Sequence, residues 1–159
     1  MVSHFRKVAV VIGFYLGMVV SINLISIPFA LEEIQEQCPE GSRNCAHMSL
    51  ALNVPESEFN SAMEEWESTR VFTSTFEEGH IVDRTLFMQF PDDMYYENNC
   101  GSIELHSQSR LGGSDLGVNQ NRLDDIKEFL DEYEWSGEVC QKGFPSSSTK
   151  TTLTPIPAL

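Results

Sequence analysis

Two segments of the chain place apolar residues three or four positions apart, which is the spacing of one face of an α-helix. In the first segment this face carries Phe59, Met63 and Trp66. The residues before it, Val54-Pro55-Glu56, are typical of a helix start, because proline is tolerated in the first turn. The second segment runs from 119 to 135. Its apolar stripe consists of Leu123, Ile126, Leu130 and Tyr133. We therefore expect two amphipathic helices.

Between these segments the pattern changes to the alternation that is typical of strands. Residues 69–77 are rich in β-branched and aromatic side chains and predict a strand, and Glu78-Gly79 favours a hairpin turn after it. Residues 80–90 predict a second strand and residues 104–110 a third. On the second strand one face would carry Val82, Leu86, Met88 and Phe90. The intervening residues 91–101 predict a turn-rich insertion.

This order of elements predicts an α+β fold. Residues 46–53 are short and mixed, so they could form either a strand or a loop. Short connections favour a small antiparallel sheet of at least three strands that packs against the two amphipathic helices. Residues 31–142 would form this domain. Residues 143–159, which are rich in serine, threonine and proline, predict a disordered tail.

The N-terminus is predicted to be a signal peptide or a membrane anchor, in residues 1–30. Arg6 and Lys7 precede residues 8–30, which are uncharged and mostly apolar. This stretch is longer than the ~7–15 apolar residues of a signal peptide and near the ~20 that span a bilayer. Cleavage after Ala30, Ser21 or Ser26 and retention as an anchor both stay open. In either case the basic end stays inside and the acidic residues 31–36 face outward.

The charge of the chain excludes one class of partner. The net charge is −14, and because Arg6 and Lys7 are the charged residues of 1–30, the rest carries 8 basic against 24 acidic side chains, or −16. A body this acidic repels phosphate backbones, so we expect no nucleic acid as a partner. An anionic membrane surface would also be a poor partner for this body as a whole.

An outward location decides how the cysteines are interpreted. The chain has four, and an even number in an exported domain favours disulfides. Three pairings are possible. We favour Cys38–Cys45, which residues with turn propensity separate, and Cys100–Cys140. The alternative is a metal site made of Cys38, Cys45 and His47, but the spacing is not that of a C-x-x-C pair. We therefore expect no metal ion and no cofactor.

The residues with the greatest chemical potential lie between Ile103 and Arg122. Here an alternating segment runs into Gly112-Gly113, and small polar residues then lead into the second predicted helix. Glycines let the backbone bend, and small polar side chains can satisfy buried backbone groups or hold a ligand. The candidate ligand-binding residues are Asp83, Ser107, Ser109, Arg110, Ser114, Asp115, Asn119 and Arg122.

Together with Cys38-Pro39 and Asn44-Cys45, this segment resembles the uncharacterised family called domain of unknown function 1499. The family pattern R-S-x-S-R-x-G-x-S-D-x-G-x-N-x-x-R aligns with residues 106–122, and Asp83 fits an acidic position in the second strand. The resemblance covers residues 37–132. It implies a fold and a location rather than a reaction. Two departures stand out: His106 replaces an arginine of the pattern, and Arg84 replaces a second aspartate that is common there.

Two interpretations of these residues compete. In the first, Arg110 lies between Asp83 and Asp115 and braces the loop. Ser114 or Asp115 would accept backbone N–H groups, and Asn119 would cap the helix. In the second, the glycine-rich loop presents N–H groups to a small anionic or polar ligand, and the two arginines of the segment add positive charge. Both are compatible with a non-catalytic accessory protein, which is our leading hypothesis.

Two further hypotheses come from other classes. An extracytoplasmic hydrolase would use Ser107 or Ser114 with His106 and Asp115, although neighbouring residues of a strand point to opposite faces. A purely structural, membrane-tethered interaction module would need none of these groups. The acidic pairs Asp92-Asp93 and 124–125 do not have the spacing of a calcium loop, and we expect them to be solvated.

Overall fold

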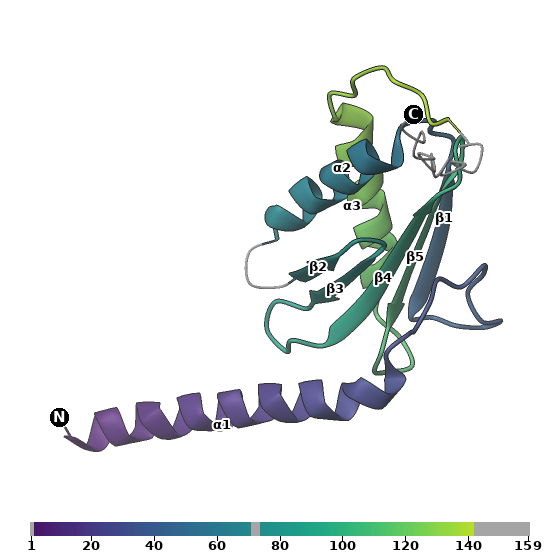
Figure 1. Cartoon of the computed structure of the whole chain (residues 1–159). Helices are drawn as coiled ribbons and strands as arrows, with labels where there is room; N and C mark the ends of the chain where they lie inside the picture. Colours follow the sequence, from purple (N-terminus) through teal and green to yellow (C-terminus); the bar gives the residue numbers. More distant parts are fainter. Residues whose placement is uncertain (1, 71–73, 142–159) are drawn as a thin grey trace, which may run out of the picture.

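The protein forms a five-stranded antiparallel sheet with helices packed on it (Figure 1). The structure is a computed structural model, and it describes residues 2–70 and 74–141. The strands are β1 (Cys45–Leu50), β2 (Ser74–Glu77), β3 (His80–Arg84), β4 (Pro91–Asn98) and β5 (Ile103–Ser109). Their order across the sheet is β1-β5-β4-β3-β2, and every neighbouring pair is antiparallel. The expected α+β class is confirmed.

Both predicted amphipathic helices are present. They are α2 (Glu56–Ser68) and α3 (Val118–Glu132), and they cover the same face of the sheet (Figure 1). Phe59 and Trp66 of α2 and Leu123 of α3 are fully or almost fully buried. They meet Ile103 and Leu105, which alternate on the covered face of β5. The apolar stripes read from the sequence are therefore the core.

The prediction for residues 91–101 was wrong. Most of this segment is β4, which lies between β3 and β5 and pairs with both along its length. The sequence did not indicate a strand here because aspartate, which occurs twice in this segment, is uncommon in strands. Asp92 and Asp93 are 1% and 0% exposed, so the expectation that they are solvated was also wrong. Buried partners, described below, compensate their charge.

The second predicted strand ends earlier than expected. β3 stops at Arg84, and the rest of the segment forms a loop that connects it to β4. Leu86, Met88 and Phe90 therefore do not share a strand face. Residues 46–53, which could have been strand or loop, contain most of β1, an edge strand. Of the strand predicted over 69–77, the last four residues form β2. Residues 71–73 and the predicted tail lie outside the described residues.

Both favoured disulfides are formed. Cys38 pairs with Cys45, and Cys100 pairs with Cys140. The first closes a loop of the linker onto the start of β1. The second joins the turn between β4 and β5 to the segment after α3, across a sequence separation of 40 residues. Such cross-links are typical of exported domains.

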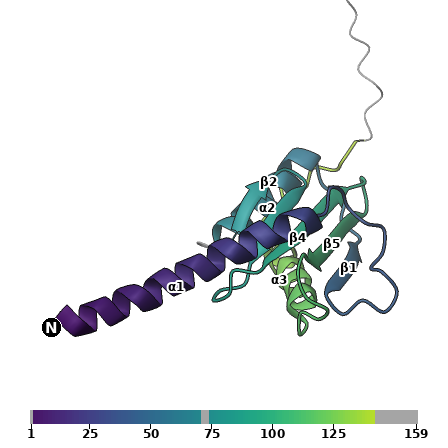
Figure 2. The ribbon, with the colours of Figure 1, turned by 90° about the horizontal axis from the view of Figure 1, so that it is seen from below.

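The N-terminal apolar segment is one long helix, α1 (Val2–Ser26), followed by a short 3-10 turn, η1 (Ile27–Phe29). By length and composition, residues 4–29 could cross a membrane. Seen from below, α1 runs under the end of the domain at which the β3–β4 loop and the loop before α3 lie (Figure 2). The side-chain hydroxyl of Tyr15 donates a hydrogen bond to the carbonyl of Phe87 in the first of these loops (2.9 Å).

Candidate functional site

Arg122 is the centre of a buried hydrogen-bond network between α3 and the sheet. Its Nε donates to Asp83 Oδ2 (2.9 Å) and its Nη2 to Asp92 Oδ2 (2.7 Å). Its Nη1 donates to Ser107 Oγ (2.8 Å) and to Asn119 Oδ1 (2.6 Å). One guanidinium thus joins β3, β4 and β5 to α3. We call these five residues the Arg122 network.

A second arginine extends this network toward α2. Arg70 donates to Asp83 Oδ2 through Nε and Nη2, at 3.1 and 2.9 Å, and to Asp125 Oδ2 through Nη1. Its guanidinium also lies over the ring of Trp66. Asp83 Oδ2 therefore accepts from two arginines. Among the described residues, Asp83 Oδ1 is buried and has no hydrogen-bond partner.

The start of α3 is fixed by Asp115. Its carboxylate accepts hydrogen bonds from the backbone N–H of Asn119 (2.8 Å) and of Gly117 (3.0 Å). Gly117 has a φ of 85°, which a residue with a Cβ adopts only under strain. Burial raises the pKa of Asp115, but these hydrogen bonds outweigh it and hold the pKa below its ordinary value. The predicted contact of Asp115 with backbone N–H groups is confirmed.

We expected Asn119 to cap the helix. It lies instead inside α3 and is fully buried. Its side-chain amide donates to Ser109 Oγ (2.9 Å), to Asp115 Oδ2 (2.7 Å) and to the carbonyl of Asn44 (3.0 Å). Asn119 therefore ties the linker, β5 and the loop before α3 to the Arg122 network.

Arg110 belongs to a separate cluster on the other face of the sheet. Its Nε and Nη2 form a fork on Asp93, at 2.9 and 2.6 Å. His80 Nε2 lies 2.8 Å from the same carboxylate, and the backbone N–H of Leu31 donates to it (2.9 Å). Burial raises the pKa of Asp93, but the hydrogen bonds from His80 and Arg110 outweigh it and keep the pKa below its ordinary value. This cluster holds the linker against the sheet.

The structure thus divides the predicted site between two faces. Asp83, Ser107 and Arg122 converge within the Arg122 network, and Ser109 and Asp115 adjoin it through Asn119. Arg110 contacts Asp93 instead of either carboxylate that the bracing interpretation assigned to it. The buried arginine between two carboxylates is Arg122, and the more exposed Arg70 also contacts two. Ser114 is exposed in the loop before α3.

The residues of the hydrolase hypothesis do not converge either. Ser107 Oγ donates to Asn119 Oδ1 (2.7 Å) on the helix-covered face. His106 points to the opposite face, where its Nε2 lies 3.6 Å from Cys45 Sγ. Asp115 is occupied with backbone N–H groups. Within the described residues, these groups do not form a nucleophile–base–carboxylate chain.

Two hollows flank the Arg122 network. A cleft of about 620 Å³ lies beside Asp83, and three arginines line it: Arg70, Arg84 and Arg122. A second hollow, of about 370 Å³, lies between the β3–β4 loop and the loop before α3. Its lining is mostly apolar. Thr85 and Val118 border both hollows.

Arg84 is the unusual arginine of the cleft. Its Nη1 donates to Thr75 Oγ1 (3.1 Å) and its Nε to Asn23 Oδ1 (3.4 Å), and both acceptors are neutral. No carboxylate among the described residues lies within 4.0 Å of it, since the ion pairs of the cleft involve Arg70 and Arg122. The position at which the family pattern often has an aspartate therefore carries an uncompensated positive charge here.

Sequence reasoning missed three residues of these clusters: Arg70, Asp92 and Asp93. The available signal was the position of the two aspartates between Phe90 and the aromatic-rich Met94-Tyr95-Tyr96, where solvated acids are uncommon. Arg70 lies at the end of a helix in a polar segment. Nothing in its sequence neighbourhood distinguishes it from a surface arginine.

The metal alternative takes another form in the structure. Cys38, Cys45 and His106 bring potential ligand atoms within 4.8 Å of one another. The two sulfur atoms are, however, bonded to each other in a disulfide, and a metal ion needs free thiolates. The oxidised protein therefore does not offer this group as a metal site.

These features define a small, disulfide-bonded α+β domain behind an apolar helix, with a buried arginine–carboxylate network as its most distinctive feature. The chain belongs to the family described as "Protein of unknown function (DUF1499)", whose model matches residues 37–130. The matched region contains the whole Arg122 network. A search of curated proteins found no match.

Proposed function

We propose that the protein is an outward-facing, membrane-anchored accessory protein that binds a small anionic ligand in the arginine-lined cleft without transforming it. The anchor would be α1. Its 25 residues correspond to about 37 Å, enough for a hydrocarbon core of about 30 Å. Arg6 and Lys7 at its start favour an inside N-terminus, and the two disulfides favour an oxidising compartment for the domain.

The observation that supports an anionic ligand is that Arg84 donates to two neutral oxygens and has no carboxylate partner among the described residues. A guanidinium in a concave site, bonded to neutral oxygens, is most stable when a carboxylate or phosphate joins it. Asp83 indicates that the ligand should also carry a hydrogen-bond donor. Because its buried Oδ1 has no partner among the described residues, a ligand with a hydroxyl or amino group next to its anionic group would suit the cleft best.

Binding without catalysis fits the same geometry. The two carboxylates of the cleft, Asp83 and Asp125, already accept hydrogen bonds from Arg70 and Arg122. A nucleophile needs a general base beside it, whereas the hydroxyls of Thr69 and Thr85 in the cleft hydrogen-bond to backbone groups instead. The cleft supplies cations and hydrogen-bond acceptors, which suffice for recognition.

Thermal unfolding of the full chain in detergent micelles tests the ligand. The probes are inorganic phosphate, glycerol phosphate, lactate and acetate, each against chloride at equal ionic strength. We expect at least one probe to raise Tm in the wild-type protein and the shift to vanish in Arg84→Gln. Arg43→Gln is the matched control, because Arg43 is an exposed arginine elsewhere on the domain. A shift that persists in Arg84→Gln, or its absence with every probe, would contradict the cleft as an anion site.

The anchor has a separate test. Membranes from cells that express the full chain are washed with alkaline carbonate, and the mass of the retained protein is measured. An anchored chain stays with the membrane at its full mass. A chain released at a mass that lacks residues 1–30 is an exported protein whose signal peptide was removed.

A further inference from the structure

Four large apolar side chains project from one end of the domain. Among the described residues beyond α1 and η1, the exposed large apolar side chains are these four and Val139. The four are Leu86, Phe87 and Met88 in the β3–β4 loop and Leu116 in the loop before α3, with exposed fractions of 74%, 76%, 40% and 93%. We call them the apolar tip. The two loops border the same apolar hollow.

The β3–β4 loop is built to expose these side chains. Its backbone is closed on itself: Thr85 N–H donates to the carbonyl of Phe90 (3.1 Å), and Gln89 N–H donates to that of Thr85 (2.9 Å). The Gln89 side chain donates to the carbonyl of Leu86 (3.2 Å). These hydrogen bonds keep the loop closed, with its apolar side chains facing outward.

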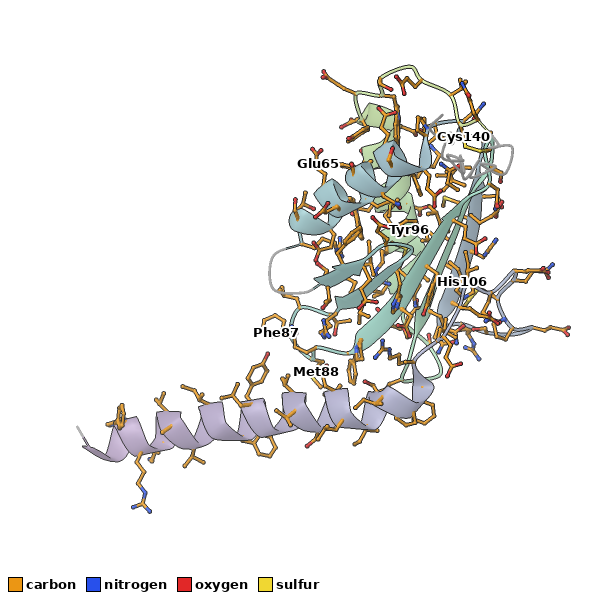
Figure 3. The ribbon with its side chains drawn as sticks, viewed as in Figure 1. Glu65, Phe87, Met88, Tyr96, His106 and Cys140 are labelled. Atoms are coloured by element: carbon orange, nitrogen blue, oxygen red, sulfur yellow. A yellow bond between two sulfur atoms is a disulfide. The ribbon has the colours of Figure 1, made fainter. Side chains whose placement is uncertain are left out.

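The chain leaves α1 at this same end. The backbone N–H of Leu31 donates to Asp93 (2.9 Å), and the Tyr95 hydroxyl donates to the carbonyl of Leu31 (2.7 Å). These contacts fix Leu31, the second residue after η1, to the first five residues of β4, the part nearest the tip. Figure 3 shows Phe87 and Met88 on the edge of the domain that faces α1. A membrane that holds α1 would therefore lie next to the apolar tip.

The carboxylates on the strands near the tip are buried. The acidic residues on the strands that lead to the tip, Asp83, Asp92 and Asp93, are at most 1% exposed, and each is paired with an arginine. Arg84 stands directly before the loop. Although the domain as a whole is strongly acidic, these residues present little negative charge to lipid headgroups.

We propose that the apolar tip inserts its side chains into the outer surface of the bilayer that holds α1. The tip is a second membrane contact, so that the domain stands on the membrane at a fixed orientation instead of moving freely on its linker. Apolar side chains on an otherwise polar surface bind the boundary between headgroups and acyl chains in this way. The inference rests on the proposed anchoring by α1, but not on the proposed ligand.

The test measures the environment of position 87 in the full chain. Phe87→Cys is synthesised without cells into phosphatidylcholine vesicles and labelled with an environment-sensitive fluorophore. The described native cysteines are all in disulfides, so the new thiol is the one available. Glu65→Cys is the matched control, because Glu65 is exposed on α2, away from the tip (Figure 3).

We expect the probe at 87 to emit at shorter wavelength than that at 65, to be quenched by spin-labelled lipids, and to be several-fold less sensitive to aqueous iodide. Equal iodide quenching at the two positions would overturn the proposal. Protection at 87 that disappears when the protein is diluted with lipid would also overturn it, because a second copy would then be covering the tip. Flotation of the vesicles checks the anchor separately: a chain that does not float contradicts the anchoring itself.

Discussion

At the scale of single residues, Arg122 binds two buried carboxylates and joins three strands to α3. Removing it would leave Asp83 and Asp92 buried, with Asp92 lacking its ion-pair partner. We expect Arg122→Met to lower the free energy of unfolding by about 3–5 kcal/mol, the usual cost of breaking a buried ion pair from one side. Denaturant unfolding of the full chain in micelles, followed by tryptophan fluorescence, measures this value.

Arg43→Met is the control for that measurement. Arg43 is exposed, so its replacement should change stability by less than about 0.5 kcal/mol. Comparable small effects at both positions would mean that Asp83 and Asp92 find other partners or take up protons. The network would then be unimportant for stability.

His106 predicts a dependence of stability on pH. It is fully buried, its Nδ1 has no partner among the described residues, and burial lowers its pKa below the ordinary value of 6.5. A depressed histidine pKa means that the unfolded chain binds the proton more readily. Stability should therefore fall as the pH decreases from about 6.5 toward the lower folded-state pKa. We expect His106→Gln to flatten the profile in this window, while the wild-type slope persists in a variant of exposed His4.

The same residue scale shows what a sequence can predict. The polar positions near α3, such as Ser107, Asn119 and Arg122, were identified because they cluster at fixed spacing. Their partners could not be deduced, because Asp92 lies thirty residues from Arg122 and pairs with it only through the register of β4 and β5. The choice between Arg110 and Arg122 as the buried arginine likewise depends on which sheet face each one meets.

At the scale of elements, the loop before α3 depends on one carboxylate. Asp115 accepts the two backbone hydrogen bonds that would otherwise be unmade at this helix start. We expect Asp115→Ala to cost about 0.5–2 kcal/mol of stability, in the range of lost helix caps. Hydrogen exchange should show faster opening of the amides of Gly117 and Asn119. Ser114→Ala, next to it but exposed, should change neither; an equal effect at both positions would indicate a general loosening of the loop.

Elements with one buried and one solvent-exposed face could be predicted from the sequence. Elements that bury charged residues or expose apolar ones could not. α2 and α3 follow from their apolar stripes, because each stripe meets the core. β4 contradicts its own composition, since its acidic pair is stabilised by arginines from elsewhere in the chain. Leu86 and Met88 show the reverse case, because their alternation is typical of a strand but they lie in a loop. Gln89 has a φ of 55°, and the hydrogen bonds of the loop backbone turn the chain back before it can pair as a strand.

At the scale of the whole molecule, α1 cannot both cross a bilayer and keep its contact with the domain. Tyr15 precedes Ser26 by eleven residues, or about 16 Å of helix. A spanning helix would carry Tyr15 toward the middle of a hydrocarbon core about 30 Å thick. The carbonyl of Phe87 belongs to an irregular loop, and such backbone is not found in contact with lipid at that depth. Anchoring therefore requires the helix to turn away from the tip within residues 27–30.

A cross-linking experiment in vesicles distinguishes these arrangements. The pair Tyr15→Cys and Phe87→Cys is treated with a short thiol cross-linker, and Leu31→Cys with Tyr95→Cys serves as the matched pair, because both positions lie on the domain side of the turn. We expect efficient cross-linking of the second pair and little of the first. The same turn would withdraw Asn23 from Arg84 and leave its guanidinium available to an anionic ligand. If both pairs cross-link equally, α1 lies along the tip instead of spanning, and the anchor and the insertion of the tip are both excluded.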